Sequence, residues 1–344
     1  MRPAQNPPNP WQSAHVEYFA DVPPAELHVY EEEAKEVVSE NDSPDLGFTF
    51  SCNPYRGCFH GCAYCYARPS HQYLGFGAGT DFERRIVVKT NAPERLRAHF
   101  LRPSWRGELV AFSGVTDCYQ PLEASYGLTR RCLEVCHEFR NPVGVITKGA
   151  LVERDAELLG RLARDASAVV TISMPFADED LARRMEPFAG SPARRLRSMR
   201  ALADAGVRVG VAVAPVIPGL NDDQIPAVLE LAHAHGARHA FLSMLRLPAE
   251  VHDVFFERLR AAVPLRFDKV VHAIEELRGG AHDDSRFFAR FRGQGPRWRL
   301  IEQLFAVHCR RLGLNERRFE AAATFRRPQP PPTAPRARQG ELFG

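Results

Sequence analysis

The sequence predicts an α/β protein whose parallel sheet forms an open, partial (β/α)6 barrel. From Leu46 onward, short β-rich runs alternate with longer helical patterns, as in repeated βα units. Most of these runs are almost continuously apolar, as strands buried on both faces require. Six units are visible, fewer than the eight that close a barrel. The predicted strands cover residues 47–51, 108–113, 143–147, 168–173, 208–213 and 239–243.

Helical patterns lie between these strands. Leu128, Cys132, Val135 and Phe139 recur at the spacing of one helix face. Gly206 follows another such pattern and marks the end of its helix. The predicted helices cover residues 93–100, 128–140, 156–163, 194–205 and 224–235, with one more at 298–312 beyond the barrel.

The chain divides by composition into four segments. We expect an N-terminal extension (1–45), the barrel core (46–275), a C-terminal helical cap (276–325) and a proline-rich tail (326–344). The extension is acidic, with nine acids and one lysine in residues 21–45, whereas residues 285–338 hold thirteen arginines and three glutamates. Such asymmetry is typical of proteins with a nucleic-acid or acidic partner.

Targeting and membrane signals are lacking at the sequence level. The polar, proline-rich start does not resemble a signal peptide. The longest mostly apolar stretch, residues 209–220, contains two prolines and is too short to cross a membrane. We therefore expect a cytoplasmic protein that does not bind membranes.

Cys58, Cys62 and Cys65 lie in one short segment directly after the first predicted strand, with C-x3-C-x2-C spacing. In the cytosol, cysteines so closely spaced favour metal ligation over disulfides. Three thiolates can hold three irons of a 4Fe–4S cubane, which leaves the fourth iron free to bind the amino and carboxylate groups of a methionine. The alternative is a zinc site completed by His60 or a distant ligand, but the second ligand pair usual for zinc is not visible.

The spacing, with Tyr64 before the last cysteine, resembles the signature of the radical S-adenosylmethionine (SAM) superfamily. The phrase Asn-Pro-Tyr-Arg-Gly-Cys-x-His-x-Cys-x-Tyr-Cys-Tyr-Ala-Arg (53–68) resembles its bacterial branch related to spore photoproduct lyase. This resemblance implies a 4Fe–4S cluster, SAM, a 5′-deoxyadenosyl radical and a reductant such as flavodoxin or ferredoxin. It also implies that Tyr64 lies beside the SAM adenine.

Later strand ends supply further candidate SAM-binding residues. The turn after the second strand contains Gly114, Thr116 and Asp117 and matches the superfamily's glycine-rich contact to the SAM amino group. The alternative is an ordinary βα turn with Asp117 as a helix cap. Lys148, after the third strand, is a candidate for the SAM carboxylate or the substrate, or else a solvated lysine at the rim. Ser173, at the end of the fourth strand, is a candidate for the SAM ribose.

One departure from the related branch concerns hydrogen return. Spore photoproduct lyases carry a hydrogen-donating cysteine at the head of a Cys-Thr-Ser-Asp stretch. Residues 114–117 align with that stretch and place Gly114 where the thiol would be, while Cys118 lies nearby at a different position. We therefore do not expect the same photoproduct repair, even with a nucleic-acid substrate.

Two C-terminal features suggest partners. Gln339, Leu342 and Phe343 resemble the Q-x-x-L-F peptide that binds the DNA polymerase sliding clamp; the alternative is a frayed terminus or a dock onto the chain's own surface. Residues 286–299 interleave arginines with aromatics, as in nucleic-acid binding, or form a cap whose aromatics pack on the barrel.

Together these features predict a radical SAM enzyme of the lyase or oxidoreductase type that repairs or modifies DNA. The alternatives are a radical SAM enzyme acting on a protein or small metabolite, and a metal-bearing, non-enzymatic adaptor of the replication machinery.

Overall fold

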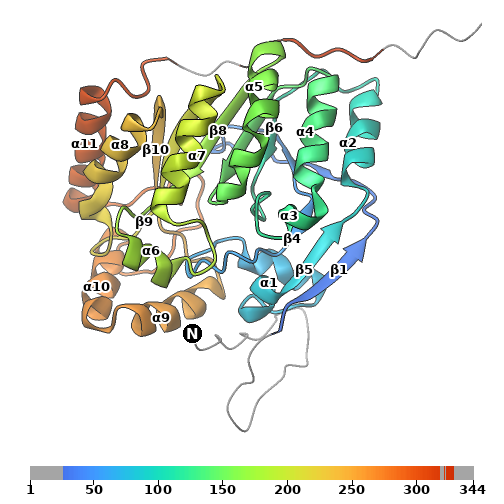
Figure 1. Ribbon diagram of the computed structural model, residues 1–344. Helices are drawn as coiled ribbons and strands as arrows, with labels where there is room; N and C mark the ends of the chain where they lie inside the picture. The colour runs from blue at the N-terminus through green and yellow to red at the C-terminus, as the bar shows by residue number, and fades with distance from the viewer. Residues whose placement is uncertain (1–25, 318–320, 322, 329–344) are drawn as a thin grey trace, which may run out of the picture.

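A twisted seven-stranded sheet forms the centre of the computed structural model, which describes residues 26–317, 321 and 323–328 (Figure 1). Its order is β10-β9-β8-β7-β6-β3-β2; six strands run parallel and β2 joins β3 antiparallel. The six parallel strands confirm the predicted partial barrel. The strands are β2 (Val38–Glu40), β3 (Phe50–Cys52), β6 (Val110–Phe112), β7 (Val143–Thr147), β8 (Ala168–Ser173), β9 (Arg208–Val216) and β10 (His239–Met244).

Helices cover one face of this sheet, the near face in Figure 1. Neighbouring helices pack in the order α2, α4, α5, α7, α8, α11, and their buried sides form the main apolar core with the strands. Ser191 caps α7 by accepting a hydrogen bond from the amide of Arg194, and Pro192 occupies the first turn. The bounds are α2 (Ala92–Leu101), α4 (Leu128–Glu138), α5 (Ala156–Asp165), α7 (Pro192–Asp204), α8 (Ile225–Ala234) and α11 (Gly295–Arg311).

Part of the predicted N-terminal extension belongs to the fold. Besides β2, it supplies β1 (His28–Glu32), which pairs in parallel with β5 (Arg85–Lys89). On its other edge β5 pairs antiparallel with β4 (Tyr55–Arg56). This small second sheet supports the segment that follows β4, which carries the three clustered cysteines.

A second apolar cluster lies beside the carboxyl ends of the strands and includes Cys62, Ala63 and Tyr64. It joins this segment to helices that the periodicity analysis did not predict. The remaining elements are α1 (Thr80–Arg84), α3 (Glu123–Tyr126), α6 (Glu179–Met185), α9 (Val251–Ala262), α10 (Phe267–Leu277), and the 3-10 helices η1 (Arg68–Leu74), η2 (Ala150–Asp155), η3 (Asp222–Gln224) and η4 (Pro264–Arg266).

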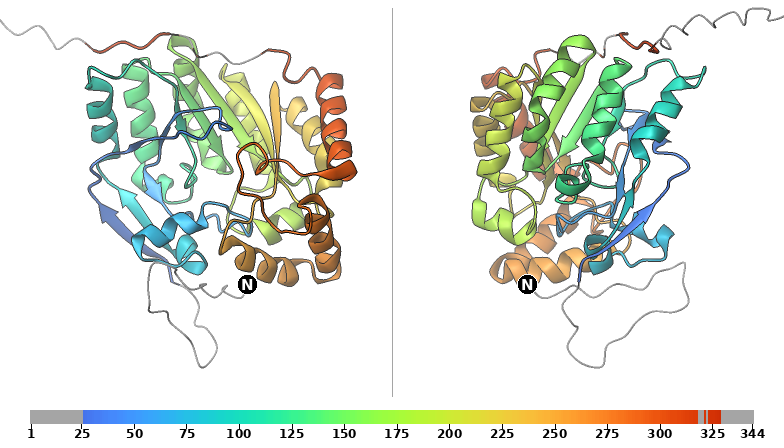
Figure 2. Two further views of the ribbon diagram at one scale, coloured as in Figure 1. Left: turned by 180° about the vertical axis from the view of Figure 1, so that it is seen from behind. Right: turned by 45° about the vertical axis from the view of Figure 1, so that its right-hand side comes forward.

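The segment between α10 and α11, here called the bridging loop (residues 281–294), crosses the face of the sheet opposite the helix layer (Figure 2, left). Its Phe291 carbonyl accepts a hydrogen bond from the amide of Met244, at the end of β10 (2.9 Å). Its Phe288 amide donates to Asp45, which precedes β3 (2.9 Å). The bridging loop therefore connects opposite sides of the open barrel.

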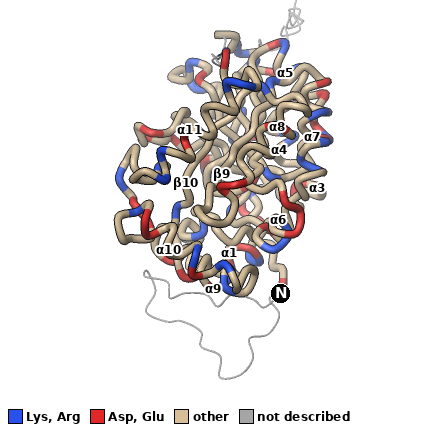
Figure 3. The backbone as a smooth tube through the Cα atoms, turned by 90° about the vertical axis from the view of Figure 1, so that its left-hand side faces the viewer, with Lys and Arg blue, Asp and Glu red and all other residues tan. Residues whose placement is uncertain are grey.

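Many arginines of the basic C-terminal region are paired with acids. Arg286 pairs with Asp284 and Arg290 with Asp45. Further pairs join Arg292 to Glu302, Arg297 to Asp222 and Arg311 to Glu230. Figure 3 shows acidic and basic residues mixed along α9, α10 and α11. The charge excess in the sequence therefore does not form a continuous basic surface over these helices.

The predicted clamp-binding peptide with Gln339, Leu342 and Phe343 lies outside the described residues. Among the helices of the described part, none combines the length and apolarity needed to span a bilayer.

Candidate functional site

The segment with the three cysteines, here called the cysteine loop (residues 57–66), depends on glycine at its start. Gly57 has a φ of 76°, which favours glycine over other residues. A Cβ atom there would lie 2.8 Å from the carbonyl oxygen of Phe82. That same carbonyl accepts a hydrogen bond from the amide of Cys58 (2.9 Å). The close approach of the two backbones at Gly57 therefore places the first cysteine.

Two arginines fix the middle of the cysteine loop by binding its carbonyl groups. Arg68, fully buried at the start of η1, donates to the carbonyl oxygen of Cys62 (2.8 Å). Arg258 on α9 donates to the carbonyl oxygen of Gly61 (2.7 Å). Both guanidinium groups pair with the buried carboxylate of Glu83. A charged cluster thus holds the backbone between Cys58 and Cys65, and only Arg68 belongs to the motif recognised in the sequence.

Thr116 contacts the cysteine loop. Its hydroxyl donates to the carbonyl oxygen of Gly57 (2.5 Å). Gln120 donates to the same carbonyl (3.1 Å) and accepts from the amide of Phe59 (3.0 Å). The turn after β6 therefore holds the start of the cysteine loop through hydrogen bonds from Thr116 and Gln120.

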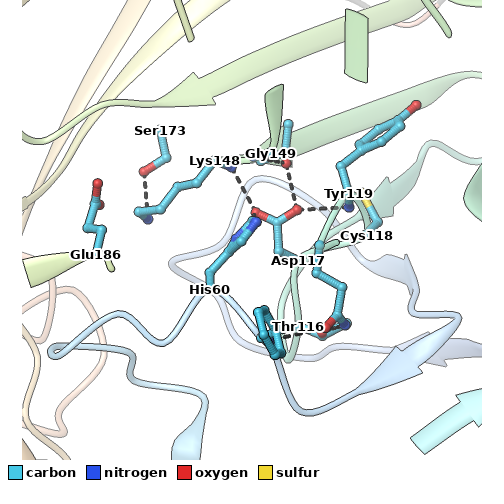
Figure 4. A network of polar contacts seen from close by, with 12 residues as sticks. His60, Thr116, Asp117, Cys118, Tyr119, Lys148, Gly149, Ser173 and Glu186 are labelled. Carbon is cyan, nitrogen blue, oxygen red and sulfur yellow. Dashed lines mark hydrogen bonds and ion pairs between the residues drawn. The ribbon is translucent and has the colours of Figure 1, made fainter. Parts of the chain in front are cut away.

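Asp117 also has its partners within the protein (Figure 4). It accepts hydrogen bonds from the Thr147 hydroxyl (2.6 Å) and from the amides of Lys148 (2.8 Å) and Tyr119 (2.9 Å). Its carboxylate lies 3.4 Å from Nδ1 of His60. Burial alone would raise the pKa of Asp117, but His60, the Lys148 amide and the Thr147 hydroxyl hold this pKa well below its usual range. The carboxylate thus links the cysteine loop to the ends of β6 and β7.

Three predicted SAM-binding residues meet on the barrel side of the cysteine loop. The Lys148 ammonium donates to the Ser173 hydroxyl (2.9 Å) and lies 5.5 Å from the centre of the Tyr64 ring. Figure 4 shows the Lys148 side chain extended toward Ser173, with Glu186 close by. The residues come from the cysteine loop, the end of β7 and the end of β8, so the fold brings together what the sequence separates.

Glu186 and Arg195, which the sequence analysis did not single out, anchor this group from behind. Glu186 accepts a hydrogen bond from the Tyr64 hydroxyl and pairs with Arg195. Arg195 also donates to the backbone carbonyl of Ser173 (2.9 Å). Burial, reinforced by Glu186, raises the pKa of Tyr64 well above its usual value, so the phenol remains a hydrogen-bond donor.

Gly114 and Cys118 differ sharply in what surrounds them. Gly114 has a φ of 115°, and a Cβ atom there would meet nothing within 4 Å. Its backbone therefore borders open space. Cys118 belongs to the main apolar core, is 1% exposed, and its thiol contacts the carbonyl oxygen of Phe112 (3.6 Å).

The three sulfurs of the cysteine loop fit an iron cluster. Cys58 and Cys62 are buried, Cys65 is half-buried, and all three are free of disulfides. Backbone amides of His60 and Ala67 interact with the Cys58 and Cys65 sulfurs, which favours bound thiolates. Burial raises the pKa of Cys62 to about 12, so its thiolate needs a compensating cation.

A cubane and a single ion make different demands on these side chains. Within the described ranges, no three His, Cys, Asp or Glu side chains are grouped so as to hold one metal ion, and the His60 ring faces Asp117. In a cubane each thiolate binds a different iron, so its ligands need not converge on one point.

Comparison with known proteins identifies several relatives. An uncharacterised protein of Mycobacterium tuberculosis is 40% identical over 196 residues, which cover 56% of this chain and 58% of that protein. A solved spore photoproduct lyase variant superposes with a TM-score of 0.59 at 14% identity, covering 83% of this chain and 80% of the other. Spore photoproduct lyase complexed with dinucleoside spore photoproduct gives 0.51 at 16% identity, covering 67% and 66%. At these identities the two structures show a shared fold.

The family match covers the part of the chain that holds the site. Residues 52–232 match the sequence model of the radical SAM superfamily. They contain the cysteine loop and the strand ends that carry Gly114, Lys148 and Ser173. Because this match spans more than half of the 344 residues, the chain belongs to the radical SAM superfamily, whose members use a 4Fe–4S cluster and SAM.

Proposed function

We propose that this protein uses SAM to generate a radical that acts on a base in nucleic acid. In this proposal Cys58, Cys62 and Cys65 hold the 4Fe–4S cluster. When bound and reduced, the cluster and SAM together supply a 5′-deoxyadenosyl radical that abstracts a hydrogen atom from the substrate. The observation that carries the proposal is the convergence of Lys148, Ser173 and Tyr64 beside the three thiols of the cysteine loop, two buried and one half-buried.

The residues around the site have separate tasks in this proposal. Lys148 supplies a positive charge for the SAM carboxylate, and Ser173 offers a hydroxyl to the ribose. The Tyr64 ring provides an apolar face for the adenine. Glu186 and Arg195 are positioning residues, because they hold Tyr64 and the Ser173 backbone in place. Gly114 presents its backbone to the open space without a side chain in the way.

The substrate class rests on two supports. The fold is shared with spore photoproduct lyase, which has been solved with a dinucleoside photoproduct bound. In addition, the exposed Tyr66 ring at the end of the cysteine loop lies against the guanidinium of Arg246, a combination that suits bases and phosphates. We therefore propose a damaged or modified base as the target, and repair or modification of DNA by a lyase- or oxidoreductase-type reaction as the role.

Anaerobic reconstitution tests the radical part of the proposal. The wild-type chain should bind about four irons with matching sulfide and cleave SAM when reduced. Alanine at Cys58, Cys62 or Cys65 should abolish both, whereas Cys309→Ala, on α11 and outside the site, should keep both. Stoichiometric zinc without SAM cleavage would instead support the adaptor alternative and refute the enzyme.

The substrate class needs its own assay. Damaged and undamaged oligonucleotides should be incubated with the reduced, cluster-loaded protein and SAM, and analysed by mass spectrometry. A SAM-dependent change in a base supports the proposal. Turnover of peptides or small metabolites, with none of any oligonucleotide, contradicts the nucleic-acid substrate but leaves the radical chemistry intact.

A further inference from the structure

Phe288, in the bridging loop, is held in an unusual conformation. Its φ of 65° lies in the left-handed region, which is strained for a bulky residue. The carboxylate of Asp45 fixes it there by accepting its amide hydrogen (2.9 Å). The ring is nevertheless 63% exposed, and that of the preceding Phe287 is 52% exposed. The strained backbone is therefore not compensated by burial of the ring, which points to a role for the ring at the surface.

Buried charged groups make the bridging loop rigid. Asp45 pairs through both oxygens with Arg290, and both side chains are almost fully buried. Arg278, 6% exposed, donates to the carbonyls of Ala289 (3.2 Å), Arg290 (3.1 Å) and Arg292 (3.0 Å). A segment fixed by so many contacts presents Phe287 and Phe288 in a defined position.

A continuous line of side chains joins this segment to the cysteine loop. Tyr66 follows Cys65 directly and is 48% exposed. The guanidinium of Arg246 lies 5.7 Å from the Tyr66 ring and 5.2 Å from the Phe291 ring. On the other side of Phe291, Arg290 lies over both Phe291 (4.9 Å) and Phe287 (5.0 Å).

Arg246 differs from Arg286, Arg290 and Arg292 of the bridging loop, because those three arginines pair with carboxylates. Within the described part of the chain no carboxylate forms an ion pair with Arg246, and its Nε is buried without a hydrogen-bond partner. Arg290, by contrast, is neutralised by Asp45. Asp283 and Asp45 attract this charge only from beyond ion-pair distance. A cation without a paired carboxylate, held between two aromatic rings, suits an anionic ligand that also carries flat rings.

We propose that Phe287, Phe288 and Arg246 form a binding site for a single nucleic-acid strand at the entrance to the radical site. The Phe rings stack on unpaired bases, and Arg246 contacts a phosphate. The inference rests on the nucleic-acid substrate proposed above and specifies how the strand is held. A protein partner would more readily use a purely apolar surface, whereas the exposed Phe287 ring lies against the guanidinium of Arg290.

Phe288→Gly gives a sharp test because glycine adopts a positive φ without strain. The variant removes the ring and should fold at least as stably as the wild type. Binding of a fluorescent single-stranded oligonucleotide to the cluster-loaded protein should weaken about five- to hundredfold. SAM cleavage without nucleic acid should be unchanged. Leu300→Ala, an equally exposed apolar position on α11 (64%), should bind like the wild type.

An abasic strand of the same length separates stacking from phosphate binding. The wild type should bind the abasic strand more weakly than the normal strand. Phe288→Gly should show a smaller difference between the two strands, because only Phe287 can still stack on a base. If the wild type binds both strands equally, or if Phe288→Gly binds the normal strand as well as the wild type, the stacking site is wrong and the proposed substrate stands. If the wild type binds no nucleic acid, both the stacking site and the proposed substrate fail.

Discussion

Replacing Glu83 with glutamine tests how the cysteine loop is held in place. Glutamine keeps the shape of the side chain but leaves Arg68 and Arg258 without their common carboxylate. Glu83 is 4% exposed and Arg68 is fully buried. Removing one partner of a buried ion pair costs about 3–5 kcal/mol, a large share of the roughly 5–15 kcal/mol that stabilises a typical domain. The loss should loosen the carbonyl contacts at Gly61 and Cys62 as well.

The assay is urea unfolding at neutral pH, with iron content after reconstitution as a second measurement. Burial would raise the pKa of Glu83, but the two arginines hold it below its ordinary value, so the charge and its contribution are complete at neutral pH and lost on acidification. Glu157→Gln is the matched control because Glu157 pairs with Arg161 on the surface, where such a pair is worth about 0.3–0.5 kcal/mol. Equal unfolding midpoints for the two variants would refute the reasoning.

Three further predictions concern the site and the bridging loop. Gly57→Ala should lose about 1–3 kcal/mol of unfolding free energy and most of its iron, because the new Cβ would meet the Phe82 carbonyl. The control is Gly206→Ala, which is also at positive φ but borders open space. It should lose less unfolding free energy and keep its iron. Lys148→Met should retain the cluster but bind SAM more weakly in equilibrium dialysis, and unchanged affinity would show that Lys148 does not contact SAM. Burial opposes ionisation of Asp45, yet Arg290 and the Phe288 amide lower the pKa of this carboxylate. The Phe288 amide should therefore be protected from hydrogen exchange at pH 7. It should lose this protection as the pH falls below the ordinary range of an aspartate, because a protonated Asp45 binds the amide more weakly. Protection that does not change on acidification would contradict that anchor.

The parallel strands were the most predictable part of the fold. Residues 143–147 and 168–173 form β7 and β8 with the predicted bounds, because buried parallel strands need continuous apolar runs that end abruptly at polar residues. Helix ends were less well defined. α7 begins at Pro192, two residues before the predicted start, although Ser191 followed by proline is itself a helix-start signal.

Two elements absent from the prediction nevertheless have a recognisable sequence pattern. Ile86, Val87 and Val88 form a β-branched run in β5, and α9 buries Val251, Val254, Phe255 and Leu259 at helical spacing. Strands β1 and β2 gave no such signal. They are short and largely exposed, and they form because neighbours distant in sequence offer free edges for pairing.

Within the site, sequence motifs located the cysteines but could not assign the supporting charges. Charged residues are expected at the surface, so nothing in the local sequence distinguishes the buried Glu83, Glu186 and Arg195 from solvated ones. Their partners are also distant: Arg258 and Gly61 are separated by 197 positions. Likewise the turn after β6 marked Thr116 and Asp117 as a functional unit, but only the fold shows that both side chains contact the cysteine loop and its neighbours.

The surroundings of Gly114 and Cys118 bear on how a reaction in this site could end. A substrate radical must regain a hydrogen atom or lose an electron, and the resemblance to spore photoproduct lyases implies that their hydrogen-donating cysteine corresponds to Gly114 here. Glycine supplies no hydrogen donor, and the nearest thiol in sequence, Cys118, is buried in the main core on a backbone carbonyl. Since no side chain fills the space at Gly114, the same turn leaves room for a ligand where the lyases have a reactive thiol. Under the proposed function, the hydrogen atom would therefore have to come from a donor other than a thiol at this position, and we expect a product that differs from that of the lyases even on a similar substrate.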